Sequence, residues 1–157
     1  MSEILTDQEA GGVDGMQGQY LTFSICDVLY GVELLRVIDI IMIQSITHVP
    51  HLPNYIKGII NLRGSVVPVI DARIKLNQEE AEYDDKNCII ILDINGPHVG
   101  MIVDRVAEVV SPEPDDLSIP PKVEASGRNH YLTSVANIDN KIILNLDCEK
   151  FFLDDIA

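Results

Sequence analysis

The chain has 157 residues, of which 46% are hydrophobic and 5% aromatic, with no Trp and a formal net charge of −14. This length suits one ordinary domain or two very small ones, with a core built mainly from Ile, Val and Leu. The negative charge argues against nucleic acid or an anionic membrane as the main partner, because both select basic surfaces.

The first stretch, MSEILTDQEAGGVDGMQGQ, is acidic and contains several Gly residues. It lacks the cationic start and apolar run of a signal peptide, and no later run approaches the ~20 apolar residues of a membrane span. We therefore predict a flexible tail over residues 1–18, no direct membrane insertion and a cytoplasmic location. Cys26, Cys88 and Cys148 are widely spaced in apolar runs without a CxxC, which is typical of reduced core residues.

Short β-like runs rich in Ile and Val dominate the rest of the chain. They cover residues 20–26, 28–33, 36–43, 65–71, 88–106 and 131–147. Asn95-Gly96 and Asp139-Asn140 predict hairpin turns, because these residues accept positive φ. Short helices are expected at 54–57, 71–76 and 147–152, and a Pro-rich acidic loop at 111–130. The pattern predicts a mostly β fold of small barrels or a sandwich.

The chain also repeats itself. The matched segments are 30–41 with 99–110, at a shift of 69, and 55–71 with 131–147, at a shift of 76. The segments occur in the same order and share Gly, Arg, Tyr, Asn and Asp positions. We interpret them as two similar small β-barrels, with repeat blocks 20–76 and 88–152, intertwined in a single domain over residues 19–154.

Arg63 interrupts the apolar stretch KGIINLRGSVVPVID. A guanidinium is costly to bury without a partner. In the repeat, Arg63 aligns with Asp139 of the second predicted turn, and Asp-Asn pairs have no preference for strands. The alignment therefore predicts a turn at Arg63-Gly64, with the Arg63 side chain near its tip and free of a burial penalty.

No P-loop, GxSxG, HExxH, paired CxxC or dinucleotide fingerprint is present. His48 and His51 have a spacing that could serve a metal on a helix, but Pro50 and Pro53 favour a loop. We expect no metal, no cofactor and no enzymatic activity. The alternative, a small-ligand-binding or enzymatic barrel, would require a cofactor fingerprint or a convergent polar pocket.

Four stretches resemble, in order and spacing, the CheW family of chemotaxis coupling proteins: YGVELLRVIDII, VPHLPNYIKGIINLRGSVVPVIDARIKL, HVGMIVDRVAEVV and YLTSVANIDNKIILNLD. The resemblance implies two SH3-like five-stranded β-barrels and no catalysis. It implies an adaptor that couples the cytoplasmic tips of transmembrane chemoreceptors to the regulatory domain of the CheA histidine kinase, in arrays beneath the inner membrane. An adaptor of another chemosensory pathway, such as surface (twitching) motility, remains the alternative.

The resemblance also implies partner-binding positions, which fall on Val37, Asp39, Gly58, Arg63, Val106 and Val109. The family usually has Glu where this chain has Asp39, so an Asp39–Arg63 pair would have a reach shorter by one methylene. We expect receptor contact along an apolar groove between the barrels, with Gly58 allowing close backbone approach. We expect kinase contact through exposed barrel ends and edges. The assignment of single residues to one partner stays open.

Overall fold

The structure of the protein is a computed structural model that describes residues 18–120 and 131–156. Eleven strands lie in this part of the chain: β1 (Tyr20–Ile25), β2 (Val28–Glu33), β3 (Val37–Met42), β4 (Ile56–Leu62), β5 (Ser65–Asp71), β6 (Cys88–Asp93), β7 (His98–Val103), β8 (Arg105–Val110), β9 (Leu117–Ser118), β10 (Leu132–Ile138) and β11 (Lys141–Leu146). The short helices are η2 (Leu34–Arg36), α2 (Ala72–Lys75), η3 (Pro114–Asp116) and α3 (Cys148–Ile156). The predicted mostly β fold with short helices is confirmed, whereas nearly all of the predicted tail lies outside the described residues.

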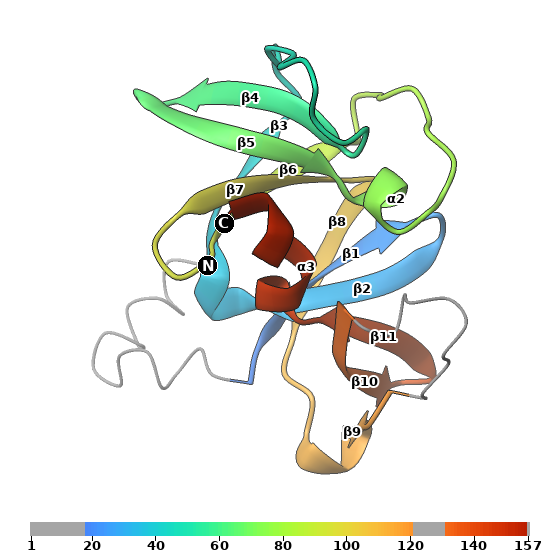
Figure 1. The fold of residues 1–157 in the computed structure, drawn as a ribbon. Coiled ribbons are helices and arrows are strands. Elements are labelled where there is room, and N and C mark those ends of the chain that lie inside the picture. Colours follow the sequence, from blue (N-terminus) through green and yellow to red (C-terminus); the bar gives the residue numbers. More distant parts are fainter. Residues whose placement is uncertain (1–17, 121–130, 157) are drawn as a thin grey trace.

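The strands form two sheets, with the orders β8-β1-β2-β11-β10-β9 and β3-β6-β7-β5-β4 (Figure 1). Neither sheet closes on itself within the described residues, so both are open where the family resemblance implied five-stranded barrels. One of the two sheets has six strands. The segment after β3 nearly closes the five-stranded sheet. Thr47 and Ile59 exchange both backbone hydrogen bonds, at 2.8 and 2.9 Å, and so hold this segment against β4.

The two halves of the chain interleave between the sheets. Hairpin β1–β2 pairs with β8 of the second half, and hairpin β6–β7 pairs with β3 of the first half. The parallel pairs β5–β7 and β11–β2 have matching registers, since Val69 lies opposite Gly100 and Asn145 opposite Gly31. Val69 corresponds to Asn145 at the shift of 76 found in the sequence, and Gly31 corresponds to Gly100 at the shift of 69. A Cβ at Gly31 would overlap the side-chain oxygen of the fully buried Asn145, so a larger residue would force that side chain to move.

The main hydrophobic core lies between the two sheets and includes Phe23, Met101, Leu146, Phe151 and Phe152, all fully buried. Burial of one such side chain contributes about 1.5–3 kcal/mol. The α3 helix supplies Phe151 and Phe152 and lies between the sheets (Figure 1). A second, smaller cluster lies within the five-stranded sheet and is built mainly from Ile and Val. The core therefore holds both sheets and both halves of the chain in one body.

The α2 helix begins where the sequence predicted it. The buried Asp71 carboxylate accepts hydrogen bonds from the backbone N–H groups of Arg73, at 2.9 Å, and Ile74, at 3.3 Å. These are helix N-terminal donors with no partner inside the helix. The Tyr83 hydroxyl donates a third hydrogen bond to Asp71, at 2.7 Å. Asp71 thus caps α2 and anchors the loop before β6.

Candidate functional site

The β4–β5 connection is the predicted turn, with positive φ at both Arg63 (53°) and Gly64 (88°). The Asn61 side-chain oxygen accepts a hydrogen bond from the Gly64 N–H at 2.9 Å and stabilises the turn. Asp139 and Asn140 have the same left-handed backbone in the β10–β11 turn. The Arg63 side chain is 76% exposed, so its guanidinium remains in water although its neighbours in sequence are apolar.

Asp39 reaches Arg63 despite its short side chain. Its carboxylate lies 2.9 Å from Arg63 Nη2, and its other oxygen accepts a hydrogen bond from the Ile40 N–H at 2.8 Å. A pair this exposed stabilises a fold by only about 0–1 kcal/mol. Its effect is mainly geometric, because it ties β3 to the β4–β5 turn at the opposite end of the sheet order and presents one cation in a set direction.

Gly58 is buried in β4, at a shift of register with β5 and with a φ of 145°. A Cβ at this position would overlap the backbone carbonyl of Thr47. The close backbone approach expected at Gly58 is therefore made by the chain's own Thr47. The glycine lets the segment after β3 lie against β4. Gly58 therefore acts on the site indirectly, by fixing the chain that continues from β3.

One side of β3 forms an exposed apolar row. Val37, Asp39 and Ile41 are half-buried, whereas Ile38 is 45%, Ile40 is 40% and Met42 is 67% exposed. β3 is also an end strand of its sheet. Exposed apolar residues in a row on an end strand are typical of a partner-binding surface. The sequence predicted a β-like run over residues 36–43 but did not identify which of its residues face outward.

Val106 and Val109 lie on β8, an end strand of the six-stranded sheet, and are half-buried against the central core. The register of β8 with β1 shifts between them. At this point the buried Thr22 hydroxyl donates to the Glu108 carbonyl at 2.6 Å and accepts from the Glu108 N–H at 3.0 Å. Val37 contacts the same core from the other sheet. The structure thus brings Asp39 and Arg63 together and places the two β8 valines on the other sheet.

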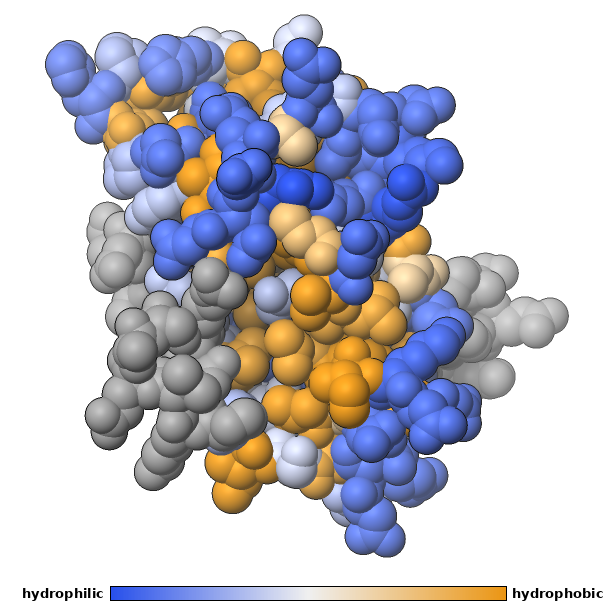
Figure 2. Space-filling view, turned by 90° about the vertical axis from the view of Figure 1, so that its right-hand side faces the viewer, coloured by the Kyte–Doolittle hydropathy of each residue, from blue (hydrophilic) through white to orange (hydrophobic). Residues whose placement is uncertain are grey.

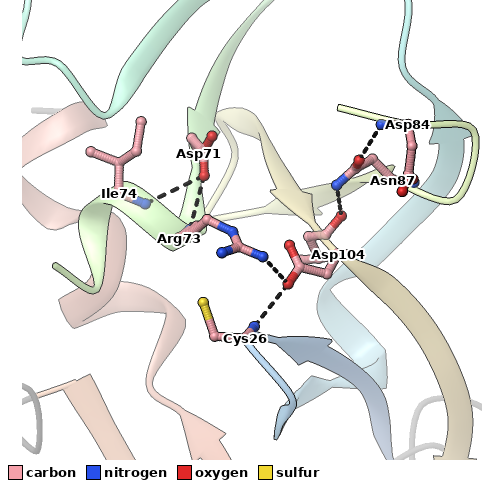
Figure 3. Close-up of polar contacts among 8 residues, drawn as sticks. Cys26, Asp71, Arg73, Ile74, Asp84, Asn87 and Asp104 are labelled. Atoms are coloured by element: carbon pink, nitrogen blue, oxygen red, sulfur yellow. Dashed lines mark hydrogen bonds and ion pairs between the residues drawn. The ribbon is translucent and has the colours of Figure 1, made fainter. Parts of the chain in front are cut away.

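A polar cavity of about 470 Å³ lies beside the β1–β2 turn, α2 and the start of β8 (Figure 3). Its polar groups bind one another: Arg73 Nη2 lies 2.6 Å from Asp104, and the Cys26 N–H donates to the same carboxylate at 2.8 Å. Burial raises the pKa of the Cys26 thiol, which keeps it protonated at neutral pH and makes it a poor nucleophile. These contacts favour a structural junction over a catalytic site.

A second cavity, of about 410 Å³, is lined mainly by apolar residues of β1, β2, α2, β10 and β11. Hydrophobic side chains gather on this side of the molecule, below a hydrophilic area (Figure 2). None of the six predicted partner-binding residues lines it. Within residues 18–120 and 131–156, no group of three or more His, Cys, Asp or Glu side chains is arranged to hold a metal ion. Nor does any helix in that part have the length and apolar character needed to cross a membrane.

Two β-sheets built from interleaved halves of the chain, with one exposed apolar face on an end strand, are typical of a protein-interaction module. The family model described as "CheW-like domain" matches residues 19–155, so the chain belongs to the CheW-like family. It is 31% identical over 132 residues to a chemotaxis protein CheW of Klebsiella aerogenes, covering 84% of this chain and 80% of that protein.

Two further proteins are similar to this chain over most of its length. It is 26% identical over 129 residues to the protein FrzA of Myxococcus xanthus, covering 82% of this chain and 80% of that protein. The crystal structure of the scaffolding protein TtCheW from Thermoanaerobacter tengcongensis is similar, with a TM-score of 0.80 and 31% identity, over 89% of this chain and 94% of that chain. The Klebsiella and Thermoanaerobacter proteins are named as a chemotaxis protein and a scaffolding protein.

Proposed function

We propose that this protein is a non-catalytic adaptor that couples the cytoplasmic tips of transmembrane chemoreceptors to the regulatory domain of the CheA histidine kinase. In this role it supports receptor control of kinase autophosphorylation, in arrays beneath the inner membrane. The observation that carries the proposal is the exposed Arg63 cation, which Asp39 holds on one face of the end strand β3 while the other face exposes an apolar row, in a chain of the CheW-like family.

The proposed receptor contact involves Val37, Asp39 and Arg63, together with Val106 and Val109. Apolar residues with a polar rim bind weakly through a small area, and each contact gains strength when many copies act together in an array. Arg63 suits the rim, because its exposed guanidinium is already held in one direction by Asp39. A partner that supplies a carboxylate near Arg63 would share this cation without having to order it first.

The proposed kinase contact involves the exposed ends of the sheets. Val66 and Ile142 occupy equivalent positions beside the two hairpin turns and are 67% and 51% exposed. Isolated exposed apolar residues are common on protein surfaces, but an equivalent pair at both ends of one molecule supports binding of two partners with similar surfaces. This arrangement would let one adaptor bridge neighbouring kinase domains or receptors.

Reconstitution of kinase activity tests the proposal directly. Purified kinase and receptor cytoplasmic fragments are mixed with and without this protein, and autophosphorylation is measured. We expect the protein to increase receptor-dependent kinase activity and to bind both partners in separate pull-down experiments. Failure to bind either partner would refute the proposed function.

A second pathway is the alternative. One relative, FrzA, is not itself named a chemotaxis protein, which leaves a related chemosensory pathway such as surface (twitching) motility open. The adaptor role is the same in both cases and the pathway differs. A deletion strain scored for swimming and for twitching distinguishes the two pathways. Loss of twitching alone would assign the protein to surface motility.

A further inference from the structure

The chain passes from one sheet to the other at two points, and an ion pair holds each crossing. Between β2 and β3, Arg36 of η2 lies 3.2 Å from Glu149 of α3. Between β7 and β8, the single residue Asp104 lies 2.6 Å from Arg73 of α2. Arg36 lies in the first half of the repeat and binds α3, which follows β11 of the second half. Asp104 lies in the second half and binds α2, which follows β5 of the first half.

The helix residues of the two ion pairs are equivalent and opposite in charge, whereas the crossing residues are one position apart in the repeat, because Arg36 corresponds to Arg105. Arg73 and Glu149 correspond at the shift of 76, yet one is a cation and the other an anion. Each pair has a further bond to a hairpin turn: Asn95 donates to Glu149 at 2.7 Å, and the Cys26 N–H donates to Asp104 at 2.8 Å. Each crossing is thus held by an ion pair to the helix of the other half, with the charges reversed.

Three of the four paired side chains are partly buried, whereas Glu149 is 52% exposed. The side chains of Arg36, Arg73 and Asp104 are only 22–24% exposed. Burial acts to lower the pKa of Arg73, but the hydrogen bond and charge of Asp104 outweigh it and raise that pKa. Hydrogen bonds from Asn95 and Arg36 lower the pKa of Glu149. Each shift indicates that the charged form is favoured in the folded protein.

We propose that Arg36 and Asp104 are positioning residues, which hold the first residues of the end strands β3 and β8 and thereby place Val37 and Val106 for partner binding. β3 and β8 are each bonded to a single neighbouring strand, so the start of each strand is held on one side only. Val37 directly follows Arg36, and its repeat equivalent Val106 lies two residues after Asp104. This inference rests on the proposed function for its effect on binding.

Variants of the β7–β8 crossing test the proposal, with affinity for a receptor cytoplasmic fragment as the first readout. Asp104→Asn keeps an acceptor for the Cys26 N–H but removes the ion pair, and Arg73→Gln removes it from the other side. We expect each to weaken binding roughly three- to tenfold, the range that corresponds to one modest ion pair. Arg73→Lys keeps the positive charge, so this variant should retain most of the wild-type affinity.

Glu80→Gln is the matched control. It breaks the Lys57–Glu80 ion pair, which is equally short at 2.7 Å but joins β4 to the loop before β6 and lies away from both crossings. We expect this variant to bind like the wild-type protein. If Asp104→Asn and Glu80→Gln bind equally well, the positioning role is refuted.

Hydrogen exchange separates this inference from the proposed function. We expect Asp104→Asn to accelerate amide exchange over residues 105–110 relative to Glu80→Gln, with β5, β6 and β7 unchanged. If the wild-type protein binds no receptor or kinase, the proposed function fails while this exchange result still decides the positioning role. Unchanged exchange over residues 105–110 overturns the inference whatever the binding data show.

Discussion

The two hairpin turns, Arg63-Gly64 and Asp139-Asn140, have the same left-handed backbone but opposite charge. In the first half the cation pairs with Asp39 across the sheet. The repeat equivalent of Asp39 is Glu108, and Glu108 and Asp139 both line a cavity of about 300 Å³. The second half therefore places two acids where the first half has an ion pair. The two turns share a backbone conformation and differ in side-chain charge.

The largest difference between the halves is expected at Gly58. Its repeat equivalent is Ser134, which carries a side chain at the matching shift of register. Gly58→Ala should lower the free energy of unfolding by roughly 2–4 kcal/mol, because its Cβ would overlap the Thr47 backbone. Gly58→Asp should cost at least as much. Chemical denaturation measures both.

Ser134→Ala is the control for the Gly58 variants. It removes a hydroxyl that accepts a hydrogen bond from Asn145 at 3.0 Å, so we expect a smaller loss of about 1 kcal/mol. A fully stable Gly58→Asp that fails only in binding would show that Gly58 contacts a partner and does not mainly support β3.

Arg63→Ala should separate binding from stability. We expect about a tenfold loss of affinity for a receptor fragment or for the kinase, since the exposed cation of the proposed site is removed. The free energy of unfolding should change by less than about 1 kcal/mol, as for other exposed ion pairs. Asp139→Ala, in the equivalent turn, should leave receptor affinity unchanged. A large drop in thermal stability of Arg63→Ala would instead assign Arg63 a structural role.

Val66→Glu and Ile142→Glu compare the two exposed ends. Both residues are exposed, at 67% and 51%, so both variants should fold with nearly unchanged melting temperature. We expect each to weaken kinase binding a few-fold, because a charge would be desolvated at an apolar contact. Titration of the kinase regulatory domain measures the affinities. Two variants that both bind like wild type would remove the sheet ends from the proposed kinase surface.

The smallest effect is expected from Asp139→Arg, which gives the second turn the charge of the first. A new pair with Glu108 would stabilise the fold by about 0.2–1 kcal/mol, but Arg accepts positive φ less readily than Asp, which offsets part of the gain. We therefore expect a net change within about 0.5 kcal/mol, with a stabilising contribution that declines as salt is added. Salt-independent stability would mean that residue 139 and Glu108 do not interact.

Local sequence signals determined much of the fold. The turn at Arg63-Gly64 followed from its alignment with Asp139-Asn140, and the cap at Asp71 from an acidic residue before a short helix. Turn and cap preferences depend on a few adjacent residues, so they can be read without tertiary information. The repeat itself was visible because both halves use similar residues in the same order, and the family resemblance rested on the same stretches.

Only the tertiary structure decided which strands pair, and this determines the site. β3 pairs with β6 and β8 with β1, so the end strands that carry the proposed site join the other half of the repeat. Asp39 was the one charged residue in an apolar strand, yet it lies on the half-buried side because Arg63 is there to meet it. Gly58 likewise faces Thr47 because the segment after β3 pairs with β4. Such contacts join segments that are distant in sequence. The residues of one strand do not determine which strand it pairs with, in which register, or whether it lies at the edge of a sheet.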